Sequence, residues 1–167
     1  MLFIKAEQPA KKGIWRVNSE WKSKNITELW GNTFEEVLES HWLPKQHFID
    51  FEQKYKIKKE AIVCIAWADS GLWKMLKSKN NIGNVGNNDR GDVIHFATIE
   101  KGIEAMFKVL NNKYLGHKQS IGSLSPWGGG TRPFYATSQE NWNINVLNCL
   151  NTILDSSIDE SWNFRTL

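Results

Sequence analysis

The chain lacks several features that would assign it to a common functional class. No hydrophobic run approaches the ~18 residues of a transmembrane helix, so we expect no membrane insertion. The apolar run in 1–5 is too short for a signal peptide. Lys and Arg number 21 against 18 for Asp and Glu, and no long basic block stands out, so no nucleic-acid partner is expected. One domain is the default for 167 residues without an internal repeat.

Cysteine is also scarce. Only two are present, without the Cys/His spacing of a metal site, and we expect neither a metal nor a cofactor. Cys64 and Cys149 both lie in apolar, helix-like runs. Buried free thiols are the favoured interpretation, because unpaired cysteine is among the most buried residue types. A disulfide stays open as the alternative, since pairing depends on distances in space.

What the sequence does contain is a series of helix signals, so the predicted fold class is mainly α. Thr33-Phe34-Glu35-Glu36 fits a capping box, in which Thr33 and Glu36 cap each other's amides. The apolar residues that follow, through His41 and Trp42, share one helical face. Further helices are expected at 46–55, at 59–69, from Thr98 to Gly116, and after a second capping box at Thr137. The 59–69 segment is apolar nearly all round, which predicts a central buried helix.

The segments between the helices are predicted to be loops. Residues 78–97 are dense in Asn and Gly, which rules out a regular helix and predicts a short hairpin around 88–91. A longer loop is expected over 117–134, with one helical turn at 121–124 and a flexible part at 126–130. The tail after Asp155 is polar and is expected to fray.

The strongest chemical signal is Asp69, at the end of the apolar 59–69 helix and followed by Ser70-Gly71. Cleaving a glycosidic bond needs a carboxylic acid of raised pKa, which apolar surroundings can supply. A carboxylate at a helix C-terminus is disfavoured by the helix dipole, so the position invites an explanation. The plainer alternative is a polar residue that only ends the helix.

A second acid would assist water or act as the nucleophile, and Asp89 and Asp92 are the candidates. Tyr135 lies just before a predicted helix cap. The alternatives are local turn chemistry for the aspartates and simple packing for the tyrosine. His95 and His117 have no partner nearby in the sequence and receive no role.

Candidate sugar contacts come from the loops. The Asn81–Asn84 region, with Gly83, offers amide and backbone groups to N-acetyl sugars, although Asn and Gly are also the usual turn residues. Trp73 and Trp127 lie in Gly-flanked contexts and offer flat aromatic faces. Trp67 and Trp142 are predicted to belong to the core.

Taken together, these stretches resemble the bacterial and phage glucosaminidase and lytic-transglycosylase group of lysozyme-like peptidoglycan hydrolases. The stretches are Ala61–Gly71, where the family's helix ends in Glu-Ser; Asn80–Gly86; Phe96–Leu110 with Gly102-Ile103; and Tyr135–Thr137, similar to the family's Tyr-Ala-Thr. The resemblance covers about 46–154. It leaves 1–45 as an N-terminal extension of unknown role and 155–167 as a polar tail.

The resemblance implies a lysozyme-like fold with a small loop or hairpin lobe. It puts Asp69 at the catalytic acid position, where the family has Glu, and Tyr135 at the position of a cleft tyrosine. The predicted catalytic residues are Asp69, Tyr135, Asp92 and Asp89. The predicted substrate-binding residues are Ser70, Trp73, Asn81, Gly83, Asn84 and Trp127.

Two functions follow as expectations. The first is a hydrolase of the peptidoglycan glycan strand, of glucosaminidase or muramidase type. The second is a non-catalytic glycan-binding or phage virion structural module on the same fold. Without a signal peptide, a phage product acting on the host wall is expected, either released through a holin or carried by the virion, and otherwise a cytoplasmic protein. Because Asp is one methylene shorter than Glu, weak cleavage is expected, with a gain for Asp69→Glu.

Overall fold

The computed structural model describes residues 32–70, 80–86, 94–136 and 140–167. Within these ranges the protein is mainly helical, as predicted, and contains no strand, only isolated antiparallel bridges such as Ile57 with Arg165. The helices are α2 (Phe34–Ser40), α3 (Lys45–Tyr55), α4 (Lys59–Ser70), α5 (Ile99–Leu110) and α6 (Glu140–Ile153), with 3-10 turns η3 (Gly122–Leu124) and η4 (Pro126–Gly128). The predicted hairpin at 88–91 and the predicted cap at Thr137 lie outside the described residues.

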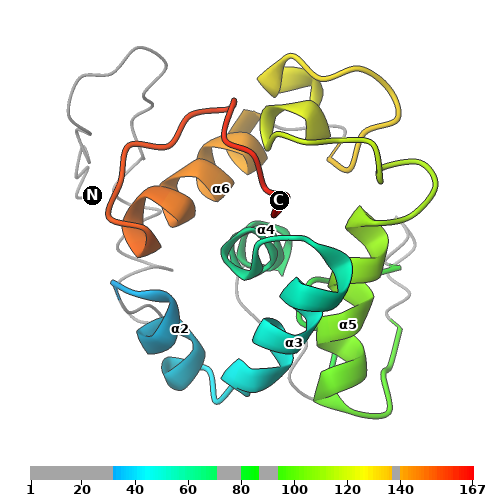
Figure 1. The fold of residues 1–167 in the computed structure, drawn as a ribbon, viewed down its shortest axis with the longest axis vertical. Helices are drawn as coiled ribbons and strands as arrows, with labels where there is room; N and C mark the ends of the chain where they lie inside the picture. The colour runs from blue at the N-terminus through cyan, green and yellow to red at the C-terminus, as the bar shows by residue number, and fades with distance from the viewer. Residues whose placement is uncertain (1–31, 71–79, 87–93, 137–139) are drawn as a thin grey trace.

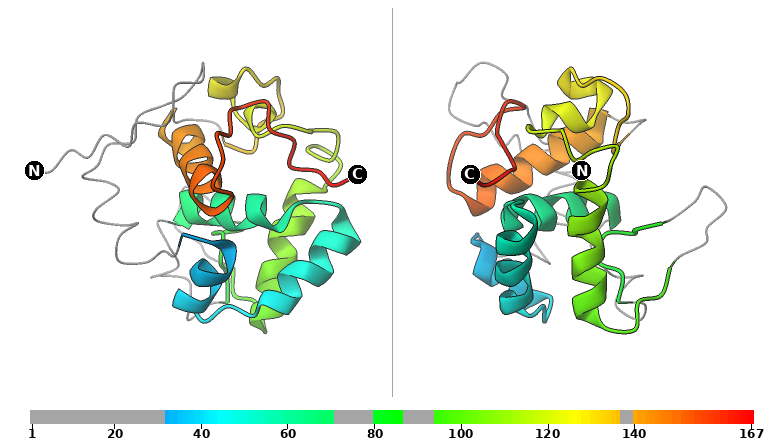
Figure 2. Two further views of the ribbon diagram at one scale, coloured as in Figure 1. Left: turned by 60° about the vertical axis from the view of Figure 1, so that its left-hand side comes forward. Right: turned by 45° about the vertical axis from the view of Figure 1, so that its right-hand side comes forward.

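Helix α4 runs through the centre of the molecule, with the other helices arranged around it (Figure 1). All residues from Ala61 to Trp67 are at most 2% exposed, which confirms the predicted central helix. Figure 2 shows α6 on one side of α4 and α2 and α3 on the other. A helix that is apolar all round needs partners on every side, and this arrangement supplies them.

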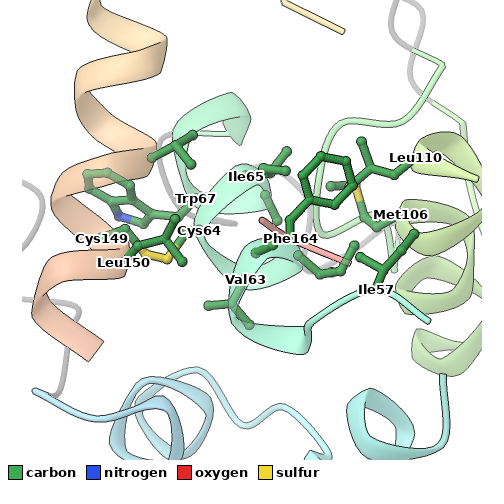
Figure 3. Packing of buried hydrophobic residues seen from close by; sticks show 14 of the residues in the cluster. Ile57, Val63, Cys64, Ile65, Trp67, Met106, Leu110, Cys149, Leu150 and Phe164 are labelled. Atoms are coloured by element: carbon green, nitrogen blue, oxygen red, sulfur yellow. A yellow bond between two sulfur atoms is a disulfide. The ribbon is translucent and has the colours of Figure 1, made fainter. Parts of the chain in front are cut away.

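A disulfide joins α4 to α6. The sulfur atoms of Cys64 and Cys149 are bonded, their Cα atoms are 5.4 Å apart, and 85 positions of sequence separate them. The free-thiol interpretation is therefore wrong. Figure 3 shows the bond among buried side chains of the two helices, beside Trp67 and Leu150. The pairing follows from two long helices packing alongside each other, which the local apolar pattern around each cysteine does not reveal.

Helix α2 belongs to the same core, although it lies in the segment that the sequence left without a role. The Oγ1 atom of Thr33 accepts from the amide of Glu36 at 3.2 Å, as predicted, whereas the Glu36 carboxylate accepts from the amide of Asn32. The ring of Phe34 packs edge-on against Phe48, with centroids 5.9 Å apart. The prediction for Trp42 is wrong: it follows the helix end at a φ of 58° and is 85% exposed.

The C-terminal tail is also part of the fold, so the expectation of fraying is wrong. Phe164 is fully buried, and its amide donates to the carbonyl of Gln119 while its carbonyl accepts from Lys58. The guanidinium of Arg165 donates to the carbonyl of Leu110 at 2.9 Å, at the end of α5, where a cation is favoured by the helix dipole. A mostly polar tail can thus be held by one apolar anchor and backbone pairing.

The loop over 117–134 is compact. Its predicted helical turn at 121–124 is confirmed as η3, and η4 follows directly. A Cβ atom added to Gly128 would lie 2.3 Å from the Cα of Gly122, so the glycines allow the two turns to touch. In the 126–130 stretch, Gly128 thus packs against η3, whereas Pro126, Trp127 and Gly129 are exposed. The helix predicted from Thr98 to Gly116 begins as expected but ends at Leu110.

Candidate functional site

The site is centred on Asp69, in the last turn of α4, where the buried helix reaches the surface. Two donors hold its carboxylate. The hydroxyl of Tyr135 donates to Oδ2, and the indole Nε1–H of Trp142 donates to Oδ1 at 2.8 Å. The three side chains come from positions 69, 135 and 142. Asp69 and Tyr135, both predicted as site residues, are therefore in direct contact.

The supporting elements explain why these side chains meet. The amides of Tyr135 and Ala136 both donate to the carbonyl of Leu124, which fixes the backbone of Tyr135 against η3. The rings of Tyr135 and Trp142 pack against each other with centroids 5.7 Å apart. Trp142 lies in the first turns of α6, the helix that the disulfide ties to α4. Rigid elements therefore hold the acid on both sides.

Burial raises the pKa of Asp69 from its ordinary 3.8 to about 7, because removal from water penalises the charged carboxylate. The hydrogen bonds from Tyr135 and Trp142 act the other way and limit the rise. Burial also raises the pKa of Tyr135 well above its ordinary value, and the nearby charge of Asp69 adds to that rise. At neutral pH, Tyr135 is therefore a neutral phenol and a large fraction of Asp69 carries a proton.

This arrangement can transfer a proton near neutral pH. A group that titrates close to the working pH is both protonated often enough and acidic enough to act as a general acid. The predicted second carboxylates, Asp89 and Asp92, lie outside the described residues. The described part of the site therefore supplies an acid with its two hydrogen-bond donors.

Ser70 connects this acid to the Asn- and Gly-rich loop. Its hydroxyl donates to the carbonyl of Ala66 at 2.7 Å, within the helix, and approaches the carbonyl of Ile82 at 3.3 Å. Ile82 is in the middle of the described part of the loop, 80–86. The predicted loop thus lies next to the acid end of α4, and Ser70 is a contact between the two.

Asn81 holds the loop together from inside. It is fully buried, its Nδ2 donates to the carbonyls of Val85 and Ile94, and its Oδ1 accepts from the amide of Val85. An amide engaged in this way stabilises the loop and is not presented to a sugar. Asn84, at a φ of 53° and only partly buried, is the more accessible of the two predicted asparagines.

Two glycines seat the loop on α5. A Cβ atom at Gly83 would lie 1.9 Å from the sulfur of Met106, and one at Gly102 would lie 1.6 Å from the carbonyl oxygen of Asn80. At Gly102 the obstacle is backbone, so this position needs glycine, whereas at Gly83 the flexible side chain of Met106 would have to move. Gly83, which we predicted as a sugar contact, is buried against Met106.

The tryptophans divide between core and surface. Trp67 is buried, as predicted, and Trp127 is 57% exposed on η4, the turn that packs against η3 next to Tyr135. Trp73 lies outside the described residues. Trp142 is buried in the core as predicted, but sequence reasoning missed its bond to Asp69. The available signal was chemical, since a buried indole N–H needs an acceptor and Asp69 was the acid predicted to be buried.

Among the described residues, no cluster of three or more His, Cys, Asp or Glu side chains could hold a metal ion. None of the helices from α2 to α6 is long and apolar enough to cross a membrane.

No protein-family model matches the chain, and no curated protein matches it. The function therefore has to be inferred from the residues of the site.

Proposed function

We propose that the protein is a glycosidase of glucosaminidase or muramidase type that cuts the glycan strand of peptidoglycan on a lysozyme-like fold. Asp69 is the general acid. The observation that carries the proposal is the Asp69 carboxyl itself, at the end of the most buried helix and held by Tyr135 and Trp142. Its burial raises the pKa to about 7. Together with the resemblance of four sequence stretches to lysozyme-like hydrolases, this supports acid catalysis at a glycosidic bond.

In this proposal Asp69 gives its proton to the oxygen that leaves the sugar. A positioned general acid contributes about 10²–10⁴-fold to the rate. Tyr135 orients the carboxyl through its hydrogen bond to Oδ2. Of the sugar contacts predicted from the sequence, Asn84 and Trp127 are described residues with accessible surface, and we assign them this role. Asp89 or Asp92 supplies the second carboxylate, and a phage holin or the virion delivers the enzyme to the wall.

The contacts of Asp69 change one expectation from the sequence. Both carboxylate oxygens are engaged, by Tyr135 and by Trp142, at the length of an aspartate. A glutamate would move its oxygens outward by about one bond length, and a displacement of ~1 Å can cost on the order of a hundredfold in rate. We therefore expect Asp69→Glu to lower the activity, because the surroundings fit the shorter acid.

A second candidate is a glycan-binding or virion structural module without catalysis. The observation that favours it is that both oxygens of Asp69 already accept hydrogen bonds inside the protein. In such a module the carboxylate would link α4, α6 and the segment of Tyr135. Binding of peptidoglycan without turnover would then be the result.

Digestion of purified peptidoglycan tests both candidates. Wild type, Asp69→Asn and Asp69→Glu are incubated with the polymer at equal folded concentration, and mass spectrometry identifies the new sugar ends. We expect cleavage by wild type and a loss of at least a hundredfold in Asp69→Asn. Undiminished cleavage by Asp69→Asn contradicts the assigned acid. Wild type that sediments with peptidoglycan but leaves it uncut supports the binding module.

A further inference from the structure

The two oxygens of the Asp69 carboxyl face donors of different kinds. Oδ1 faces the indole N–H of Trp142, and Oδ2 faces the hydroxyl of Tyr135. An indole nitrogen can only donate a hydrogen bond, whereas a phenol can donate or accept. A proton on Oδ1 would weaken the bond from Trp142 and gain no acceptor there. A proton on Oδ2 can be accepted by Tyr135 once its hydroxyl turns.

We infer that Trp142 is a positioning residue that keeps Oδ1 of Asp69 an acceptor and assigns the proton of the acid to Oδ2, on the side of Tyr135. This role in catalysis rests on the proposed glycosidase function. The hydrogen bond itself and its effect on the pKa of Asp69 are independent of that function.

The inference gives each oxygen a place in the proposed reaction. The proton leaves Oδ2 for the glycosidic oxygen, and the bond from that oxygen to the sugar carbon breaks with its electron pair. In hydrolysis, water supplies the hydroxyl of the sugar carbon, and the proton that it releases restores the acid. The carboxylate left in between accepts from both Trp142 and Tyr135, so it is stabilised when it is charged.

The disulfide supports this role of Trp142. Cys149 follows Trp142 by two helical turns, so the two side chains share one face of α6. On α4, Cys64 lies ahead of Asp69 in the same helix. The bond between Cys64 and Cys149 therefore fixes how far α6 can slide along α4. The reach of the indole to Oδ1 depends on that register.

The ionisable groups around Asp69 can be named for the described residues. Tyr135 is in direct contact, and Glu140 lies in the first turn of α6 but is exposed. The last turn of α4 and the loop at 80–86 contain no other ionisable side chain. These segments therefore add no second titration that would obscure a change in the pKa of Asp69 when the indole of Trp142 is removed.

Nuclear magnetic resonance of the full chain tests the inference. The indole N–H signal of Trp142 is identified by its absence from Trp142→Phe, and the Asp69 carboxyl carbon by its absence from Asp69→Asn. Both signals are followed from pH 4 to 9 in the wild type, so this measurement does not depend on whether a variant folds. We expect them to move with one common midpoint, and the Trp142 signal to stop moving in Asp69→Asn.

The variant arm measures the size of the effect. Trp142→Phe removes a donor to the charged carboxylate, so the midpoint of Asp69 should rise by ~1–2 pH units. Trp162→Phe is the matched control, since Trp162 contacts Lys58 and not Asp69, and should leave the midpoint unchanged. The alkaline limb of the pH profile of peptidoglycan cleavage, where the general acid loses its proton, should move to higher pH together with the midpoint.

The outcomes separate the inference from the proposed function. A Trp142 signal that does not move, or that moves with a midpoint different from that of Asp69, overturns the inference. An unchanged Asp69 midpoint in folded Trp142→Phe does the same. A common midpoint together with peptidoglycan that stays uncut supports the assignment of the proton and rejects only the glycosidase.

Discussion

Two carboxylates of this molecule each accept a hydrogen bond from a tyrosine hydroxyl, yet their pKa values are shifted in opposite directions. Glu104, on α5, accepts from Tyr55 at 2.6 Å and from Lys54 and Lys108 at 2.7 and 3.0 Å. These bonds, that of Lys54 above all, lower the pKa of Glu104 to about 2. Asp69 accepts from Tyr135 and Trp142, and its pKa rises to about 7.

The comparison shows that a tyrosine partner does not decide the charge state. Both tyrosines favour the ionised carboxylate, so the difference comes from the remaining surroundings. Glu104 lies between two ammonium groups whose side chains are themselves mostly exposed. Asp69 lies at the end of a buried helix, and its second donor is an uncharged indole. Loss of water without a gain of positive charge is what raises the pKa of Asp69.

The largest expected effect is a difference in activity between variants of the two carboxylates. Asp69→Asn should lower peptidoglycan cleavage by about 10²–10⁴-fold, because an amide cannot supply the proton. Glu104→Gln, the same chemical change at the other carboxylate, should stay within about twofold, as expected for a residue that only links two helices. Release of new sugar ends measures both. Equal losses in the two variants would show that the effect is structural.

The next largest effect concerns the disulfide that joins α4 to α6, which has no counterpart between the helices linked by Glu104 in the described residues. The disulfide closes a long loop between α4 and α6, and the chain-entropy estimate for such a loop is about 4–5 kcal/mol. The double variant Cys64→Ala/Cys149→Ala should lose free energy of unfolding of that order in urea titrations. The contacts of Glu104 between α3 and α5 should stay intact in it. A loss below about 1 kcal/mol would mean that packing alone fixes the two helices.

The pH dependence of stability should differ in sign at the two sites. The pKa of Asp69 is higher in the folded state, about 7 against 3.8, so protonation stabilises the fold at low pH. That stability is lost as the pH rises through 7, at a cost of up to about 4 kcal/mol. Asp69→Asn should therefore gain stability relative to wild type between pH 4 and 8. Parallel curves for the two proteins in urea titrations would contradict the raised pKa.

Glu104 should show the smaller and opposite effect. Its pKa is lower in the folded state, so its contribution is present above 4.5 and is lost as the pH falls toward 2. Glu104→Gln should cost about 1 kcal/mol at pH 7, because the exposed lysines are screened by solvent and salt. The difference from wild type should disappear near pH 2. The same urea titrations, extended to low pH, measure it.

Local patterns were sufficient to predict most of the helices. Thr33 and Thr98 cap helices because their side-chain oxygens accept from amides three residues on, which a sequence shows directly. The near-continuous apolar run of α4 required burial on all sides, and the structure provides it. The predicted end of α5 is wrong, because the chain after Leu110 continues the apolar spacing in separate turns. These have isolated bonds, such as that from the amide of Gly116 to the carbonyl of Asn112, and no continuous helical series.

The candidate site was predictable only in part. Asp69 follows from a carboxyl at the end of a buried helix, and Tyr135 came from the resemblance to a known family. Trp142 was assigned to the core because its spacing on the helix is apolar, and the spacing does not show where its N–H points. Asn81 and Gly83 were misjudged for a related reason. Residues that build a loop and residues that face a ligand from it have the same composition.

The disulfide has a consequence for how the protein responds to reductants. Both cysteines are fully buried, and exchange requires a thiolate to reach one of the sulfur atoms. A reductant can therefore attack only when α6 separates from α4. The rate of reduction of the native protein would report how often the core opens, and a chain that folds without the bond would have to open in the same way to acquire it. The oxidised or reduced state of the two cysteines would thus persist for as long as the core stays closed.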